Sequence, residues 1–316
     1  MKTQIIKALR LAGLSNVPKS SAVVDDFSTY LPADAYVLEG ESIYLKKLAL
    51  KMPKYASEPL VAGYGYAVEL AEKANGVFRY HEGKIVLDIK GIQFIINDFE
   101  ELFIVKEVFI EGCYNVFHPD NVIIIDIGMN VAIASLFLSA QSFIETIYAF
   151  ELFPSTFDAA LKNIALNKDT GYKIVPYKYG LGKEARKLTL PYSQQQKGSL
   201  GLYGLRKDTA YRHTTMEEVE IKNASAEFSR IAAAHVGKSI VCKMDCEGAE
   251  YDIMEDLHEN NALSKADIYM IEWHFGKPDV LIDRLVKHRF TVFCLTPGTT
   301  NDPTGLLYAV KNGGQQ

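Results

Sequence analysis

Short segments rich in β-branched residues alternate with segments of helical spacing from residue 121 onward. Strands that alternate with helices form a parallel sheet, because each helix returns the chain to the edge where the next strand begins. Five such strands are predicted, at residues 122–126, 146–151, 172–177, 240–245 and 267–274. Their nearly continuous apolar character indicates a sheet that helices cover on both faces. The alternation therefore predicts an α/β fold.

The last two strand-like segments, 290–295 and 305–310, are separated by a turn-rich connection that lacks helical spacing. We therefore expect them to pair antiparallel. Earlier in the chain, residues 154–167 are predicted to form a helix, with Ser155 and Asp158 as an approximate capping box at its start. The helix after the first strand has apolar residues on or near one face, namely Ile133, Leu136, Phe137 and Ala140.

Residues 183–225 form an insertion that is far longer than a usual connection between a helix and a strand. It contains strand-like segments at 187–190 and 217–222 around a polar stretch rich in Gly, Ser and Gln. Long loops beside a catalytic edge often act as lids, so we expect a lid here, with disorder as the alternative.

An appendage at 1–115 is predicted to precede the main domain at 116–316. Apolar residues of helical spacing, such as Leu45, Leu48 and Ala49 or Ala67, Leu70 and Ala71, predict helices and loops in the first 80 residues. Residues 84–97 alternate on both sides of Lys90 and Gly91, which predicts a β-hairpin.

The composition restricts the partners and the compartment. The net charge of −5 argues against a broad phosphate-binding surface, so nucleic acid is an unlikely partner. The four cysteines show no metal-ligand spacing and are too few for a disulfide framework, which favours a reducing cytoplasm. Lys7 and Arg10 interrupt the apolar start, which is therefore a poor signal peptide, and no apolar segment approaches the roughly 20 residues of a membrane span.

Ligands of an open parallel sheet bind at the carboxyl ends of its strands. The first strand brings Asp126, Gly128 and Asn130 to this edge, and the second ends at Glu151, an acid placed to accept hydrogen bonds from two ribose hydroxyls. Each feature alone is commonly structural, but together they favour a nucleoside cofactor. A pyrophosphate requires more glycine than Gly128 supplies, so S-adenosylmethionine is favoured over the nicotinamide cofactor of an oxidoreductase.

The fourth strand is followed by several acidic residues, of which Asp245 and Glu247 come first. Glu250 and Asp252 are interpreted as acids that stabilise the start of a helix. On the fifth strand, the alternation of side chains places Glu272 and His274 on one face and Trp273 on the other.

Five ordered segments, IIIDIGMNVAIASL, YAFELFPSTFDAALKNIALN, YGLG, CKMDCEGAEYDIM and IEWH, resemble the FkbM-type S-adenosylmethionine-dependent methyltransferases. The resemblance covers roughly residues 85–310. It implies a Rossmann-like class I methyltransferase sheet of seven mostly parallel strands, with the last strand antiparallel. Members of this family mainly methylate hydroxyl groups of sugars, glycans and small metabolites.

Carried over by position, the resemblance implies cofactor contacts from the ends of four strands. The residues concerned are Asp126, Gly128, Asn130, Glu151, Leu152, Gly180, Leu181, Asp245 and Glu247. The chain departs from the family at Ala132, where glycine is usual. Alanine permits the same close packing if its backbone angles are ordinary, so the expected effect of Ala132 is on cofactor affinity.

Methyl transfer to oxygen requires positioning and a base that removes the hydroxyl proton. His274 is the first choice as base, since a free histidine titrates near pH 6.5, and Asp245 is the second. Glu272 is predicted to orient His274 or to bind a substrate hydroxyl, although their separation along one strand could prevent a direct bond. No metal is predicted, and a divalent cation held by Asp245, Glu247, Glu272 and His274 is the alternative.

The favoured function is therefore O-methylation of a sugar, a glycan or a small metabolite, and a non-catalytic binding module of the same fold is the alternative. The other six histidines form no spaced pair and are predicted to be surface or packing residues. Three tyrosines in or beside the insertion could stack on a ring of the substrate or could pack within the loop, namely Tyr192, Tyr203 and Tyr211.

Overall fold

The computed structural model describes residues 26–193, 197, 201, 214–295 and 304–313. The chain divides into two compact units, Met1–Cys113 and Tyr114–Gln316. In the described part of the chain, no helix combines the length and the apolar character that a membrane span needs.

The first unit contains two antiparallel sheets of three strands each. One is formed by β1 (Tyr36–Glu39), β2 (Ser42–Leu45) and β3 (Leu50–Pro53), and the other by β4 (Val77–His81), β5 (Lys84–Ile89) and β6 (Ile92–Ile96). The helices among its described residues are α2 (Glu58–Ala62), α3 (Tyr64–Ala74), α4 (Phe99–Lys106) and the π-helical turn η4 (Glu107–Glu111). Short 3-10 turns occur at η1 (Phe27–Thr29), η2 (Lys46–Leu48) and η3 (Lys54–Ala56).

The predicted hairpin at 84–97 is confirmed by the antiparallel pairing of β5 with β6. The helix expected at Leu45, Leu48 and Ala49 is wrong. Leu45 ends β2, Leu48 lies in a 3-10 turn, and Ala49 has a left-handed φ of 48°. The helical spacing arose because a tight turn joins two strands whose inward side chains alternate.

The second unit is built on a seven-stranded sheet of order β15-β16-β14-β13-β7-β8-β9. The strands are β7 (Val122–Ile127), β8 (Ile144–Phe150), β9 (Ile174–Tyr177), β13 (Ser239–Met244), β14 (Ile268–His274), β15 (Phe290–Leu295) and β16 (Thr304–Lys311). β16 runs antiparallel to both of its neighbours, β14 and β15. The predicted class I methyltransferase sheet is therefore confirmed, including its antiparallel last strand.

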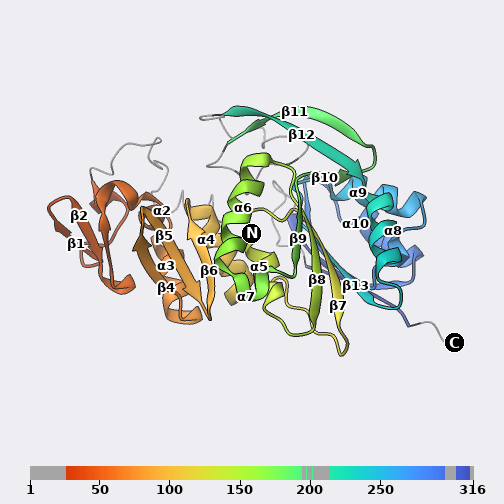
Figure 1. The fold of residues 1–316 in the computed structure, drawn as a ribbon, viewed down its shortest axis with the longest axis horizontal. Coiled ribbons are helices and arrows are strands. Elements are labelled where there is room, and N and C mark those ends of the chain that lie inside the picture. Colours follow the sequence, from red (N-terminus) through yellow and green to blue (C-terminus); the bar gives the residue numbers. More distant parts are fainter. Residues whose placement is uncertain (1–25, 194–196, 198–200, 202–213, 296–303, 314–316) are drawn as a thin grey trace. The chain divides into compact units, whose positions relative to one another are not determined.

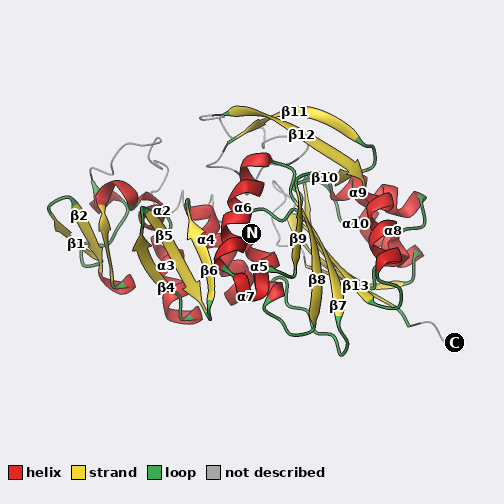
Figure 2. Cartoon of the chain, in the orientation of Figure 1, coloured by secondary structure: helices red, strands yellow, loops and turns green. Residues whose placement is uncertain are grey.

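Helices cover the sheet on both sides (Figure 1, Figure 2). One side carries α5 (Ile133–Ser139), α6 (Pro154–Leu166) and α7 (Lys168–Gly171), and the other carries α8 (Ala224–Ala234), α9 (Glu250–Glu259) and α10 (Asp279–Lys287). A 3-10 turn, η6 (Leu263–Lys265), follows α9. Apolar side chains of α8, α9 and α10 form one buried cluster with the strands, which explains the nearly continuous apolar character of the strand segments.

The predicted capping box at the start of α6 is wrong. The helix begins at Pro154 and is preceded by Phe153, which has no side-chain cap. Proline has a fixed φ that suits the first turn of a helix, so the helix starts one residue before the serine. Ser155 instead donates its backbone N–H to Glu217 of β12, with an N to O distance of 3.3 Å.

The insertion forms a small sheet of order β10-β12-β11, in which β10 (Gly180–Gly182) comes from the preceding segment. β11 (Arg186–Tyr192) and β12 (Thr215–Asn223) pair antiparallel and lie side by side (Figure 1). The two predicted strands of the insertion are therefore confirmed. Between them, the described residues are Ser193, Lys197, Gly201 and Thr214.

The loop from β7 to α5 contains three residues with left-handed backbone angles. Gly128 has a φ of 82°, Asn130 of 52° and Ala132 of 68°. A Cβ atom at Gly128 would lie 1.8 Å from the carbonyl oxygen of Asp245, so only glycine fits there. The condition of ordinary backbone angles at Ala132 is not met, since the alanine occupies a left-handed conformation that glycine adopts without strain.

We predict that Ala132→Gly stabilises the protein. A left-handed alanine destabilises the folded state by about 1–2 kcal/mol, and glycine removes this cost. Glycine also gives the unfolded chain more conformational freedom, which lowers the free energy of unfolding by about 0.5–1 kcal/mol. A net gain of about 0.5–1 kcal/mol should appear as a higher midpoint in denaturant unfolding. The matched control is Ala134→Gly within α5, which should lose about 1 kcal/mol. Equal losses for both variants would contradict the prediction.

Candidate active site

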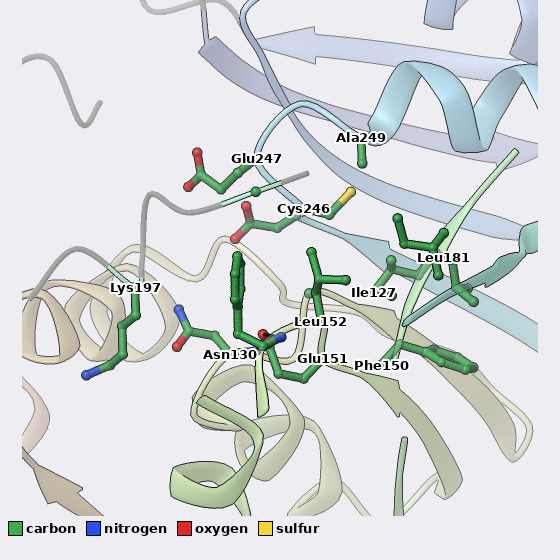
Figure 3. A pocket seen from close by; sticks show the side chains of 16 residues that line it. Ile127, Asn130, Phe150, Glu151, Leu152, Leu181, Lys197, Cys246, Glu247 and Ala249 are labelled. Carbon is green, nitrogen blue, oxygen red and sulfur yellow. Dashed lines mark hydrogen bonds between the residues drawn. The ribbon is translucent and has the colours of Figure 1, made fainter. Parts of the chain in front are cut away.

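A pocket lies at the carboxyl ends of β7, β8 and β13, with about 660 Å³ of empty space that is partly open to solvent (Figure 3). It is lined by Ile127, Gly128, Asn130, Phe150, Glu151, Leu152, Phe153, Gly180, Leu181, Lys197, Gly201, Ile221, Asp245, Cys246, Glu247 and Ala249. All residues predicted to contact the cofactor line this pocket except Asp126. The strand ends thus bring together residues that are distant in the sequence.

Glu151 follows the last residue of β8 and is 6% exposed. Its Oε2 accepts a hydrogen bond from the backbone N–H of Asn130 at 2.8 Å, and its Oε1 accepts one from Phe153 at 3.0 Å. Burial raises the pKa of Glu151 to about 7, against the opposing effect of these two hydrogen bonds. The carboxyl group is therefore held in one orientation and changes its charge near neutral pH.

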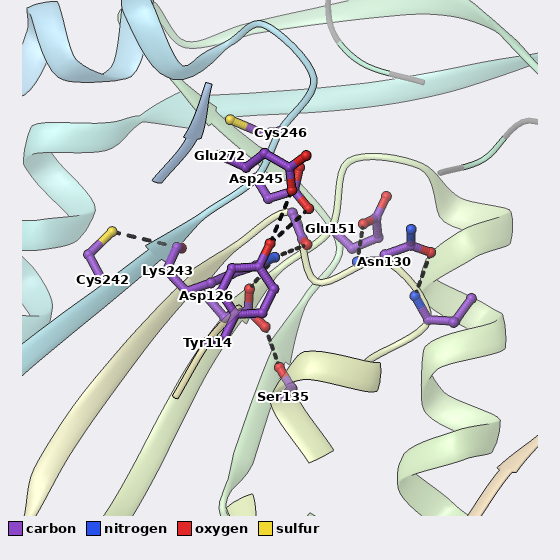
Figure 4. Close-up of polar contacts among 12 residues, drawn as sticks. Tyr114, Asp126, Asn130, Ser135, Glu151, Cys242, Lys243, Asp245, Cys246 and Glu272 are labelled. Atoms are coloured by element: carbon purple, nitrogen blue, oxygen red, sulfur yellow. Dashed lines mark hydrogen bonds and ion pairs between the residues drawn. The ribbon is translucent and has the colours of Figure 1, made fainter. Parts of the chain in front are cut away.

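Asp126 lies beneath the loop and does not line the pocket. Its carboxylate forms an ion pair with Lys243, at 3.0 Å from Nζ to Oδ1, and accepts a hydrogen bond from Ser135 (Figure 4). Burial alone would lower the pKa of Lys243, but the charge of Asp126 overcomes this effect and raises it. Lys243 also donates to the carbonyl oxygen of Gly128 at 2.7 Å. This buried pair therefore supports the loop from below.

His274 at the end of β14 is 1% exposed and has four carboxylates around its ring. Its Nδ1 lies 3.0 Å from Oε1 of Glu250. Its Nε2 lies 3.5 Å from Glu272, 3.8 Å from Glu247 and 4.0 Å from Asp245. The two residues on one face of β14, Glu272 and His274, are thus close enough for an ion pair.

The pKa of His274 differs from that of a free histidine. Burial alone would lower it, but the nearby carboxylates of Glu247 and Glu250 raise it well above 6.5. The ring also does not line the pocket. Both observations count against His274 as the group that removes a proton from a substrate.

Two members of this cluster were not predicted as site residues. Glu250 was interpreted as a helix-start acid, yet it is fully buried and holds His274. Its spacing to Ile253, Met254 and Leu257 places it on the apolar face of α9, and this is the sequence signal that could have identified it. Tyr114 donates its hydroxyl to Asp245 at 3.3 Å and to Glu272 at 3.5 Å, and no motif marks it.

The remaining predicted residues that the structure describes lie in packed or surface positions, as His81 on the surface illustrates. Tyr192 is buried, and its hydroxyl lies 3.2 Å from that of Thr156. His258 and His288 contact each other at 2.9 Å, which sequence spacing did not reveal because they come from the ends of α9 and α10. Three residues lie outside the described residues, namely Tyr203, Tyr211 and His213.

Comparison with known proteins gives a consistent result. The profile of the methyltransferase FkbM domain matches residues 126–290, more than half of the chain. Methyltransferase 1 of Beauveria bassiana is 29% identical over 173 residues, which cover 50% of this chain and 68% of that protein. Methyltransferase sdnD of Sordaria araneosa is 27% identical over 190 residues, which cover 53% and 73%.

Among solved structures, methyltransferase FkbM from Methylobacillus flagellatus KT matches with a TM-score of 0.41 and 12% identity. The match covers 65% of this chain and 47% of that chain, so the present chain spans about half of its length. The family profile begins at Asp126 and includes the strand ends that supply Glu151, Asp245 and His274. The chain therefore belongs to the FkbM family of S-adenosylmethionine-dependent methyltransferases.

Proposed function

We propose that the protein transfers a methyl group to a hydroxyl oxygen of a sugar, a glycan or a small metabolite. The observation that carries this proposal is the arrangement of the pocket. Asn130 and Glu151 lie on one side, and Glu247 lies on the other, next to the cluster around His274 (Figure 3). A cofactor held at Glu151 would therefore have an acidic, hydrogen-bonding site beside it for the acceptor.

The residues present fit the cofactor. The pocket lies at the carboxyl ends of three strands and is partly open to solvent, so a ligand can enter it from outside. The carboxylate of Glu151, held by two backbone N–H groups, can accept the hydrogen bonds of ribose hydroxyls. Leu152 and Leu181 give the pocket an apolar wall that suits the adenine ring.

S-adenosylmethionine supplies the methyl group, whose bond to sulfur breaks as the acceptor oxygen bonds to the methyl carbon. We assign the removal of the hydroxyl proton to Asp245, since it lines the pocket and its side chain is 24% exposed. Buried His274 and Glu272 lie behind Asp245 and are positioning residues. Asp245 thus replaces His274 as the proposed base.

The lid and the compartment also remain proposals. Lys197 and Gly201, the described residues in the middle of the insertion, both line the pocket, which supports a lid over the cofactor. All four cysteines are free thiols, which is consistent with the reducing cytoplasm as the compartment.

The first test is calorimetry with S-adenosylhomocysteine, followed by a methyl-transfer screen over hydroxylated acceptors. Glu151→Gln should weaken binding about 10- to 100-fold, because hydrogen bonds to the charged carboxylate are lost. The matched control is Glu145→Gln on the same strand, whose side chain pairs with Lys238 at 2.8 Å and should not matter. Absence of binding by the native protein would refute the proposal. Binding without transfer to any acceptor would favour the non-catalytic module.

The raised pKa of Glu151 predicts a pH dependence of cofactor affinity. Only the carboxylate accepts two ribose hydrogen bonds, so binding requires the deprotonated form. With a pKa of about 7 in the free protein, the affinity should fall about tenfold for each pH unit below 7 and level off above it. Calorimetry between about pH 5.5 and 8.5 measures this. The affinity of Glu151→Gln should not fall in this way below pH 7, because glutamine does not titrate. An identical pH profile for the native protein and the variant would contradict the assignment of the pH dependence to Glu151.

A further inference from the structure

The Nε2 atom of His274 has no hydrogen-bond partner among the described residues, although it is fully buried. The opposite ring nitrogen, Nδ1, contacts Glu250 at 3.0 Å. Since a carboxylate at this distance accepts a hydrogen bond, Nδ1 carries the proton. Nε2 therefore points with either a lone pair or a second N–H toward the carboxylates of Asp245, Glu247 and Glu272.

Neither state leaves this atom well satisfied. A lone pair would face oxygen atoms that carry negative charge and would be repelled by them. An N–H group would have its nearest acceptor, Glu272, at 3.5 Å, where no hydrogen bond of acceptable geometry forms. A cation that is shared by the ring nitrogen and the carboxylates would satisfy both.

The distances suit a metal ion. One donor atom each of Asp245, Glu247 and His274 lies within 4.8 Å of the other two. Ligand atoms that lie about 2.0–2.3 Å from a common ion are about 3 Å apart when they occupy adjacent coordination positions. They are about 4.5 Å apart when they occupy opposite positions. The observed distances from Nε2, 3.8 Å to Glu247 and 4.0 Å to Asp245, fall within this range.

The contact on the other side of the ring is the one that metal-binding histidines usually make. A histidine ligand commonly donates its second N–H to a carboxylate, which fixes the tautomer and orients the ring. Glu250 does this for His274 and is itself held by the backbone N–H of Cys246 at 3.1 Å. Tyr114 in turn orients the carboxylate of Asp245 through its hydroxyl.

We propose that Asp245, Glu247 and His274 bind a divalent cation beside the cofactor pocket. One imidazole and two carboxylates form a mixed donor set that suits Mn²⁺ or Zn²⁺ better than Mg²⁺, which prefers oxygen ligands alone. Asp245 and Glu247 also line the pocket, so an open coordination position of the ion can face a ligand there.

The role of the ion rests on the proposed function and deepens it. A bound cation would hold the acceptor hydroxyl and lower its pKa, so that the oxygen attacks the methyl carbon as its proton leaves. Asp245 can bind the cation and also accept the proton because its two carboxylate oxygens have different surroundings. Oδ1 faces Nε2 of His274 and would bind the cation, whereas Oδ2, which accepts a hydrogen bond from the hydroxyl of Tyr114, would take the proton. The sulfur retains the electron pair of the broken bond.

The experiment measures Mn²⁺ binding to chelator-treated, dialysed protein by electron paramagnetic resonance and calorimetry. We expect one Mn²⁺ per chain, with binding about 100-fold weaker in His274→Gln and about 10- to 100-fold weaker in Glu250→Gln. The matched control, His235→Gln, removes a histidine that contacts Tyr148 outside the site and should bind Mn²⁺ unchanged. Mn²⁺ prefers sites that include carboxylate ligands, so it should not bind to the contacting histidines His258 and His288 and confuse the measurement.

Asp245→Asn provides a second test if His274→Gln does not fold, because the side chain of Asp245 is partly exposed. Circular dichroism confirms the fold of each variant. Binding of Mn²⁺ that is weaker than about 1 mM, or equal in the native protein and in Asp245→Asn, would overturn the inference. S-adenosylhomocysteine binding to the metal-free protein is measured in parallel. If S-adenosylhomocysteine binds but Mn²⁺ does not, the metal site is refuted and the proposed function stands. If Mn²⁺ binds but S-adenosylhomocysteine does not, the proposed function is refuted and the metal site stands.

Discussion

The buried ion pair between Lys243 and Asp126 supports the whole pocket. The two residues are register partners on the neighbouring strands β13 and β7, so their side chains meet on one face of the sheet. The ammonium group of Lys243 also binds the carbonyl of Gly128, which ties the cofactor loop to the centre of the sheet. Loss of either partner would leave a buried charge, which typically costs about 3–5 kcal/mol. The position of the pocket floor therefore depends on two residues that do not themselves line the pocket.

The loop above this pair is held in an unfavourable conformation by its neighbours. The left-handed angles of Asn130 and Ala132 are maintained because Glu151 accepts the N–H of Asn130, and because Asn163 donates to the carbonyl of Val131 at 2.9 Å. Glu151 thus has two tasks, since it shapes the loop and presents its carboxyl group to the pocket. Strain that is concentrated at a binding loop is typical of functional sites, where the surrounding structure fixes the geometry before the ligand arrives.

The sequence predicted the features that depend on local periodicity and on strand ends. The order of helices and strands in the second unit, the hairpin at β5 and β6, and the strand-end residues Gly128 and Glu151 follow from such patterns. Leu152, Gly180 and Leu181 were expected only from the family resemblance. It could not predict features that depend on contacts between distant segments. Tyr114 approaches Asp245 across 131 positions, and the loop that contains Ala132 is held by hydrogen bonds with Glu151 and Asn163, which lie outside it. Glu250 lies between these cases, since helical spacing places it on a buried face but does not identify His274 as its partner.

Electrostatics connects the two sides of the pocket. S-adenosylmethionine carries a positive sulfonium that is lost on methyl transfer, so carboxylates near the reacting atoms favour the cofactor over its product. Four carboxylates within 4.0 Å of one imidazole ring would create such an environment at the proposed methyl-transfer site. The same charges would favour the divalent cation proposed at Asp245, Glu247 and His274, and this cation would in turn oppose the sulfonium. If both positive charges are held at once, several acids are needed near them. The proposed site would meet this need, because buried Glu250 and Glu272 contact His274 in addition to the two acids that line the pocket.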